Sequence, residues 1–244
     1  MSDWLRQGTN IIGAIGQMMV PALGYAGYLG KTVGSDVQSI KTGVVPADYT
    51  FAIWSFIFLF CFIYALEQAR PSRADDPLFR RIGWLTAAAF VANTVWSVIA
   101  QLQYPLIYTG LVFLVTLFTI LPAASAALQA RQGWRVNIGI GSLAGWVSIA
   151  IFANWSVIAK DWGWGNVLTA PGQALLFLTA ACVVVIAMLL VVRAHIAYWG
   201  ATLWALVGLM VGNFQRGDII VTAGAAVWLA IILLLGRWLN AKPA

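Results

Sequence analysis

Residues 106–128 read LIYTGLVFLVTLFTILPAASAAL, a run of 23 residues without a charged side chain. A helix of about 20 apolar residues is long enough to cross the hydrocarbon core of a bilayer. The rest of the chain has the same character, because 61% of its 244 residues are hydrophobic, 9% are charged and the mean hydropathy is +0.86. Soluble domains carry roughly 25% charged residues. The composition therefore predicts an integral membrane protein.

Apolar runs of this kind recur along the chain and are separated by charged, proline-containing or glycine-containing breaks. They predict an all-α, polytopic helix bundle with about eight transmembrane helices. The first run is rich in glycine and the seventh is short, so these two are the weakest. The runs cover residues 11–29, 47–68, 82–101, 106–128, 136–159, 169–192, 196–213 and 219–237.

The basic residues fit eight spans, because ten of the 14 then fall on the side that holds both termini. The positive-inside rule places that side in the cytoplasm, and we expect a bacterial inner membrane. No basic stripe indicates nucleic-acid binding. The ten residues are Arg6, Arg70, Arg73, Arg80, Arg81, Arg131, Arg135, Arg193, Arg237 and Lys242; Lys31, Lys41, Lys160 and Arg216 fall on the other side.

Tryptophan is abundant, with 13 residues, and it occupies two kinds of position. Trp54, Trp96 and Trp146 lie deeper within spans, as do two asparagines, Asn93 and Asn154. An unpartnered amide in lipid costs several kcal/mol, so we expect both asparagines to face the protein interior, either in interhelical hydrogen bonds or against a ligand. The tryptophans at span ends predict interfacial anchoring; they are Trp4, Trp84, Trp134, Trp162, Trp164, Trp199 and Trp238.

Three segments carry a resemblance to a known family, and they occur in that family's order. They resemble the second, third and fifth spans of the translocator protein / tryptophan-rich sensory protein (TspO/MBR) family over about residues 10–160. Two departures are visible: Ala47 follows Pro46 in place of a second proline, and residues 30–45 contain no tryptophan. The segments are PADYTFAIW (46–54) with IYA (63–65), NTVWS (93–97), and WVSIA (146–150) with NW (154–155).

The resemblance implies a five-helix TspO-like domain over residues 1–164, followed by a three-helix C-terminal extension over residues 165–244. It also implies a binding protein, either a sensor or a carrier, for tetrapyrroles or similar flat hydrophobic ligands. A structural or regulatory subunit and a transporter are the alternatives, and porphyrin degradation is an activity that the family suggests although no catalytic set is visible. The ligand-binding residues implied are Phe51, Trp54, Asn93, Trp96, Trp146 and Ala150.

The resemblance also sets the expected partners. These are the lipid bilayer, a hydrophobic small molecule (a porphyrin or haem, or else a sterol) and a second copy of the chain. We expect no nucleic acid, no required cofactor and no metal site.

Four further residues or motifs each have a structural and a functional interpretation. His195, the one histidine, could be an interfacial residue or an axial haem ligand. Asp48 could cap a helix or contact a ligand. The sequence Gly139-Ile-Gly141 predicts close helix packing, and the two cysteines, Cys61 and Cys182, are expected to be buried thiols.

Overall fold

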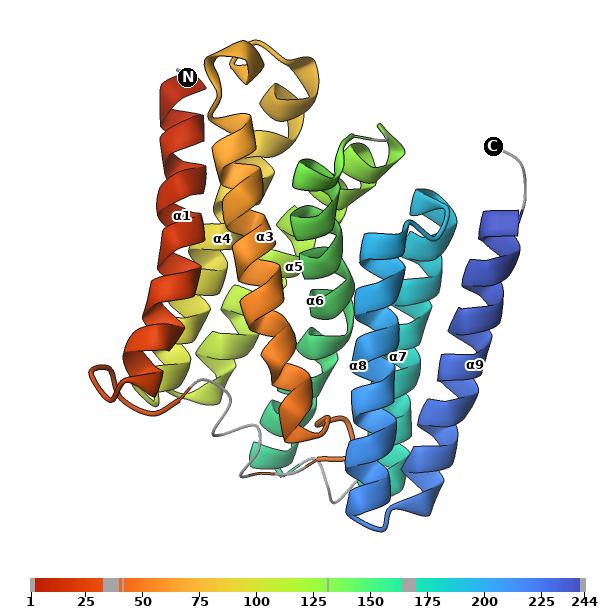
Figure 1. The fold of residues 1–244 in the computed structure, drawn as a ribbon. Helices are drawn as coiled ribbons and strands as arrows, with labels where there is room; N and C mark the ends of the chain where they lie inside the picture. Colours follow the sequence, from red (N-terminus) through yellow and green to blue (C-terminus); the bar gives the residue numbers. More distant parts are fainter. Residues whose placement is uncertain (1–2, 33–39, 41, 131, 164–169, 242–244) are drawn as a thin grey trace. The chain divides into compact units, whose positions relative to one another are not determined.

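The fold is described from a computed structural model in which residues 3–32, 40, 42–130, 132–163 and 170–241 are described (Figure 1). The described residues contain eight long helices and no β-strand, which confirms the predicted all-α class. Two short 3-10 helices, η1 (Asp48–Ala52) and η2 (Pro71–Arg73), lie in the connections. The long helices are α1 (Asp3–Tyr25), α3 (Ile53–Gln68), α4 (Pro77–Gln101), α5 (Leu106–Gln129), α6 (Trp134–Asp161), α7 (Ala170–Val192), α8 (Ile196–Gln215) and α9 (Ile219–Ala241).

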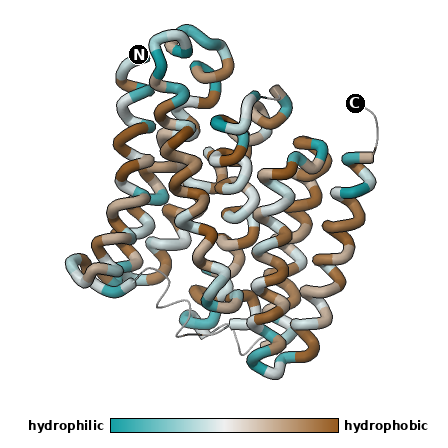
Figure 2. Tube along the Cα trace, in the orientation of Figure 1, coloured by the Kyte–Doolittle hydropathy of each residue, from teal (hydrophilic) through white to brown (hydrophobic). Residues whose placement is uncertain are grey.

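Seven of these helices are long and apolar enough to cross a membrane, with α3 counted together with η1 as the span Asp48–Gln68. Figure 2 shows this pattern on α9, where hydrophobic residues run along the helix and hydrophilic ones lie in the turn before it. The eighth helix, α1, has 23 residues, which is sufficient length, but it carries Arg6, Asn10 and Gln17. The protein is therefore a polytopic membrane protein, and the crossing of the membrane by α1 stays a prediction.

The chain divides into two compact units. The first unit comprises Met1–Ser35 and Trp54–Ala144, and the second comprises Asp36–Ile53 and Gly145–Ala244, so that the boundary falls within α6. The domain boundary predicted at residues 164 and 165 lies outside the described residues. So do three of the basic residues used above, which are Lys41, Arg131 and Lys242.

In the first unit, α1 packs against α4 through hydrogen bonds that we call the α1–α4 seam. Asn10 Nδ2 donates to the Gly83 carbonyl at 2.8 Å, and Thr86 Oγ1 donates to Asn10 Oδ1 at 2.7 Å. Further along, Asn93 Nδ2 donates to Gln17 Oε1 at 3.2 Å. Asn10 and Gln17 of α1 thus find hydrogen-bond partners on α4 rather than in solvent, which helps a helix of this composition to lie inside an apolar protein.

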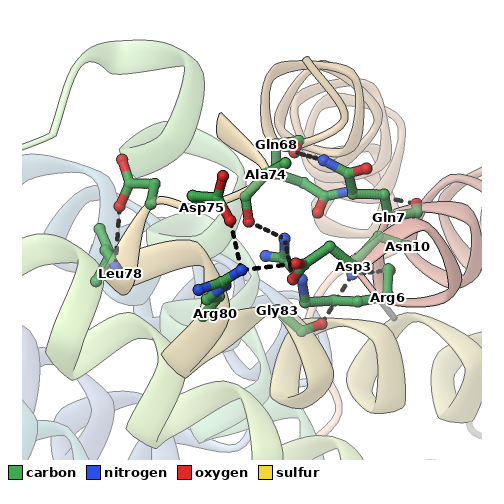
Figure 3. Close-up of polar contacts among 11 residues, drawn as sticks. Asp3, Arg6, Gln7, Asn10, Gln68, Ala74, Asp75, Leu78, Arg80 and Gly83 are labelled. Carbon is green, nitrogen blue, oxygen red and sulfur yellow. Dashed lines mark hydrogen bonds and ion pairs between the residues drawn. The ribbon is translucent and has the colours of Figure 1, made fainter. Parts of the chain in front are cut away.

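The start of α1 extends this seam into a polar network (Figure 3). Arg6 is 1% exposed, and its Nη2 donates to the Ala74 carbonyl at 3.0 Å. Gln7 Nε2 donates to the Gln68 carbonyl at 2.9 Å, and Arg80 pairs with Asp3 at 2.9 Å. These contacts fix the first turns of α1 against the ends of α3 and α4.

Two glycine contacts bring backbones close together. In the first unit, a methyl group at Gly139 of α6 would overlap the carbonyl oxygen of Phe60 on α3, which confirms the close packing predicted for this glycine. In the second unit, Gly208 of α8 lies directly against Thr50 of η1. The Ala47 amide also donates to the Gly208 carbonyl at 3.0 Å, so the segment before α3 is fastened to α8.

Candidate functional site

The six predicted ligand-binding residues are divided between the two units. Trp54, Asn93 and Trp96 belong to the first, and Phe51, Trp146 and Ala150 belong to the second. Each group is therefore considered within its own unit, and their participation in one pocket stays a prediction.

In the first unit, four aromatic rings from α3, α4 and α5 form a continuous cluster, which we call the aromatic cluster. Trp54 stacks on Phe58 with ring centroids 5.0 Å apart, and it lies 5.8 Å from Trp96 at an interplanar angle of 36°. Trp96 in turn stacks on Phe113 at 5.1 Å and 13°. The contacts between Trp54 and Trp96 thus join two stacked pairs into one series of rings.

Buried polar atoms accompany the aromatic cluster. Asn93 is fully buried one helical turn before Trp96, and its amide contacts Gln17 of α1. Asn93 Oδ1, Gln17 Nε2 and Trp96 Nε1 have no hydrogen-bond partner among the described residues. An unsatisfied buried polar group costs about 1–3 kcal/mol, so these three atoms are places where a ligand could add hydrogen bonds.

Gln17 is a residue that the sequence analysis missed. Its signal was an amide within the apolar run 11–29, of the same kind that drew attention to Asn93. The burial of Asn93 and of Asn154, which are 0% and 4% exposed, confirms that both asparagines face the interior.

In the second unit, Trp146 is 2% exposed and meets Phe51 edge to face at a centroid distance of 6.1 Å. Ala150 follows one turn later on α6 and is half-buried. Between them, Ser148 Oγ accepts a hydrogen bond from the Tyr198 hydroxyl at 2.9 Å. Two of the predicted residues of this unit, Phe51 and Trp146, are thus in contact, and Ala150 follows on α6 beyond the bond that joins Ser148 to α8.

The structure also places the other candidate residues, which are His195, Asp48 and the two cysteines. The Nδ1 atom of His195 accepts a hydrogen bond from the Ala197 amide at 3.3 Å and so caps the start of α8. Asp48 lies in the first turn of η1, whose N-cap is Ala47, so the structure does not support the capping alternative for Asp48, and its contact with a ligand stays untested. Cys61 and Cys182 are both buried free thiols, as predicted, and the described residues contain no cluster of His, Cys, Asp or Glu that could hold a metal ion.

The tryptophans at span ends behave in two ways. Trp4, Trp134, Trp162 and Trp238 are more than half exposed at helix ends, as interfacial anchors should be. Trp199 differs, because its ring packs on Gly236 and its Nε1 donates to the Ile232 carbonyl at 3.1 Å. It therefore joins α8 to α9, and its role as an interfacial anchor stays a prediction.

Comparison with known proteins gives one match. A family model described as TSPO-like protein matches residues 7–237, which includes α7, α8 and α9 and so extends beyond the stretch that carried the resemblance. Searches of the curated proteins and of the solved structures find no match. The match covers most of the chain, and the protein therefore belongs to the TSPO-like family.

Proposed function

We propose that the protein is a membrane-embedded sensor or carrier that binds tetrapyrroles or similar flat hydrophobic molecules. The observation that carries the proposal is the aromatic cluster together with the three unpartnered polar atoms of Asn93, Gln17 and Trp96. Indole faces stack on flat conjugated rings. The amides and the indole N–H can satisfy the few polar atoms of such a ligand in a region where water is scarce.

The geometry also indicates where a flat ligand would enter the cluster. The Trp54–Trp96 pair is tilted by 36°, whereas Trp96 and Phe113 are close to parallel at 13°. A ligand inserted between Trp54 and Trp96 would replace the tilted contact between these two rings. It would leave the nearly parallel stacking of Trp96 on Phe113 intact. A ligand stacked on Trp96 would also be near Asn93, which lies one turn earlier on the same helix.

The proposal is tested by titrating protoporphyrin IX into the purified full-length protein and following the Soret absorbance, which does not depend on the number of tryptophans. Loss of one stacking face is worth about 1–3 kcal/mol, so Trp96→Leu should weaken binding roughly 5- to 150-fold. Trp238→Leu is the matched control, because Trp238 is 53% exposed at the end of α9. Equal affinity of the two variants, with both folded, would reject the proposal.

The contribution of the second unit is tested in the same assay. Trp146→Leu removes the ring that contacts Phe51, and Ala150→Leu adds bulk one turn further along α6. If the ligand site includes the second unit, both substitutions should weaken porphyrin binding. If it is confined to the aromatic cluster, only Trp96→Leu should do so. Loss of the Soret band under illumination would indicate degradation of the porphyrin rather than binding alone.

A further inference from the structure

The second unit contains a polar cavity that has no part in the proposed porphyrin site. Its volume is about 280 Å³. It lies where the C-terminal ends of α6 and α8 approach the N-terminal ends of α7 and α9, beside the segment that precedes η1. Because it forms at the ends of these apolar helices, we expect it at the depth of the lipid head groups.

The walls of the cavity are held by hydrogen bonds that cross between segments distant in the sequence. The hydroxyl groups of Thr42 and Ser156 are 2.6 Å apart, which joins the segment before η1 to α6. Asn213 Nδ2 donates to the Gly43 carbonyl at 2.8 Å, which joins the same segment to α8. The cavity is therefore built from fixed elements of one unit.

Two cations and one carboxylate line the cavity, which gives it a net charge of +1. Lys160 Nζ donates to the Ile40 carbonyl at 2.7 Å, and Arg216 Nη2 donates to the Val45 carbonyl at 2.8 Å. The Val45 carbonyl orients Arg216 without neutralising its charge. No carboxylate of a described residue lies within ion-pair distance of Arg216.

The one carboxylate that lines the cavity, Asp218, bonds to the backbone at the start of α9. Its Oδ1 accepts a hydrogen bond from the Val221 amide at 3.0 Å at the start of α9. Burial lowers the pKa of Arg216, and the charges of Asp218 and Asp48 oppose that shift. An arginine keeps its proton at neutral pH, so Arg216 presents a positive charge to the cavity.

Gln173 supplies the observation that points to a ligand. It lines the cavity from the first turn of α7 and is only 9% exposed. Its amide makes no hydrogen bond to any described residue, although Ser156, Lys160 and Asn213 on the other walls all do. Gln173 is largely buried but its amide is accessible from the cavity, and unused amide donors beside two cations suit an anion with several acceptor oxygens.

We propose that this cavity binds a phosphate group, carried either by a lipid head group or by a soluble phosphate ester. Lys160 lies on α6, Arg216 directly follows α8, and the amide of Gln173 comes from α7. This arrangement suits a tetrahedral group with acceptor oxygens in several directions better than a planar carboxylate, which one arginine can satisfy. The proposal does not depend on porphyrin binding.

The test uses the full-length protein in a maltoside detergent, which contains no phosphate, and measures its thermal stability with added inorganic phosphate or glycerol 3-phosphate. Lys160→Gln and Gln173→Leu should each raise the half-maximal phosphate concentration roughly tenfold, the effect of losing one good polar contact to a charged ligand. Arg237→Gln is the matched control, since Arg237 is an exposed cation at the far end of α9. Gln173→Leu removes no hydrogen bond among the described residues, so it should fold normally.

The source of the phosphate group is distinguished by native mass spectrometry of protein purified from membranes. A lipid site predicts that phosphatidylglycerol or phosphatidylethanolamine stays bound to the unaltered protein and to Arg237→Gln but is lost from Gln173→Leu. A site for soluble esters predicts no retained lipid but a saturable response to glycerol 3-phosphate. The proposal is overturned if neither response occurs, or if Arg237→Gln weakens the response as much as Lys160→Gln and Gln173→Leu do.

Discussion

Helices α1 and α7 have the same length, 23 residues, but place their polar side chains differently. In α1 the polar residues Arg6, Asn10 and Gln17 are spread along the helix and buried against α4. In α7 the buried amide side chain is Gln173, which lies in the first turn beside a cavity. Most of the buried polar side chains of α1 hold that helix against its neighbours, whereas the Gln173 amide of α7 has no partner among the described residues and lines a cavity.

The largest effect is expected from a test of whether α1 crosses the membrane, since the comparison with α7 assumes that both helices do. Trp4 and Tyr28 flank the helix and are 69% and 82% exposed. If α1 spans the bilayer, cysteines at these positions should react with an impermeant thiol reagent from opposite sides, with Trp4→Cys reached from the cytoplasm. The native Cys61 and Cys182 are buried and give a low background. Labelling of both positions from one side would leave seven spans and place the N-terminus differently.

The next largest effect concerns the backbone contact in the first unit. Gly139→Ala would place a methyl group on the Phe60 carbonyl, so α6 and α3 must separate. Overpacking of this kind costs about 1–3 kcal/mol, and we expect the upper part of that range because the obstacle is backbone. Chemical unfolding in detergent measures it. Gly200→Ala on α8 is the control, because nothing lies within 4 Å of a methyl group there, and it should be neutral or slightly stabilising.

Two substitutions to leucine test the difference between the polar side chains of α1 and α7 directly. Asn10→Leu removes the hydrogen bonds to Gly83 and Thr86, and interhelical bonds in membranes average about 0.6 kcal/mol with a maximum near 1.7. We therefore expect a loss of about 1–2 kcal/mol in the free energy of unfolding. Gln173→Leu should not reduce stability, since its amide has no partner among the described residues. Equal destabilisation by both would show that the two helices do not differ in the way described.

These contrasts also mark how far the sequence could predict the structure. The span predicted at 106–128 matches α5 closely, because an apolar run without charges has one stable arrangement in a bilayer. Helix α1 was predicted from residue 11, whereas it begins at Asp3, because its first turns are polar and are held by contacts with the end of α3, the following connection and α4.

The candidate site was also only partly predictable, because burial of its residues follows from the local sequence whereas their partners do not. The cost of an amide in lipid was enough to predict the burial of Asn93 and Asn154. The contact of Asn93 with Gln17 joins residues 76 positions apart. The cavity around Gln173 depends on four separate segments. Neither arrangement has a local pattern in the sequence, so both required the three-dimensional fold.

The smallest expected effect concerns His195, which caps α8 at the end opposite the cavity. Burial lowers the pKa of His195 below its usual value of 6.5, because a charged imidazolium is poorly solvated there. The neutral ring is the form whose Nδ1 can accept the Ala197 amide. The stabilisation is therefore complete above pH 6.5 and is lost as the pH falls through the lowered pKa. Losing a helix cap costs about 1 kcal/mol or less for a replaceable acceptor. The melting temperature should fall slightly between pH 7 and pH 5, and His195→Asn should abolish this pH dependence, because asparagine caps a helix without titrating. A pH response that is unchanged in His195→Asn would assign it to another group.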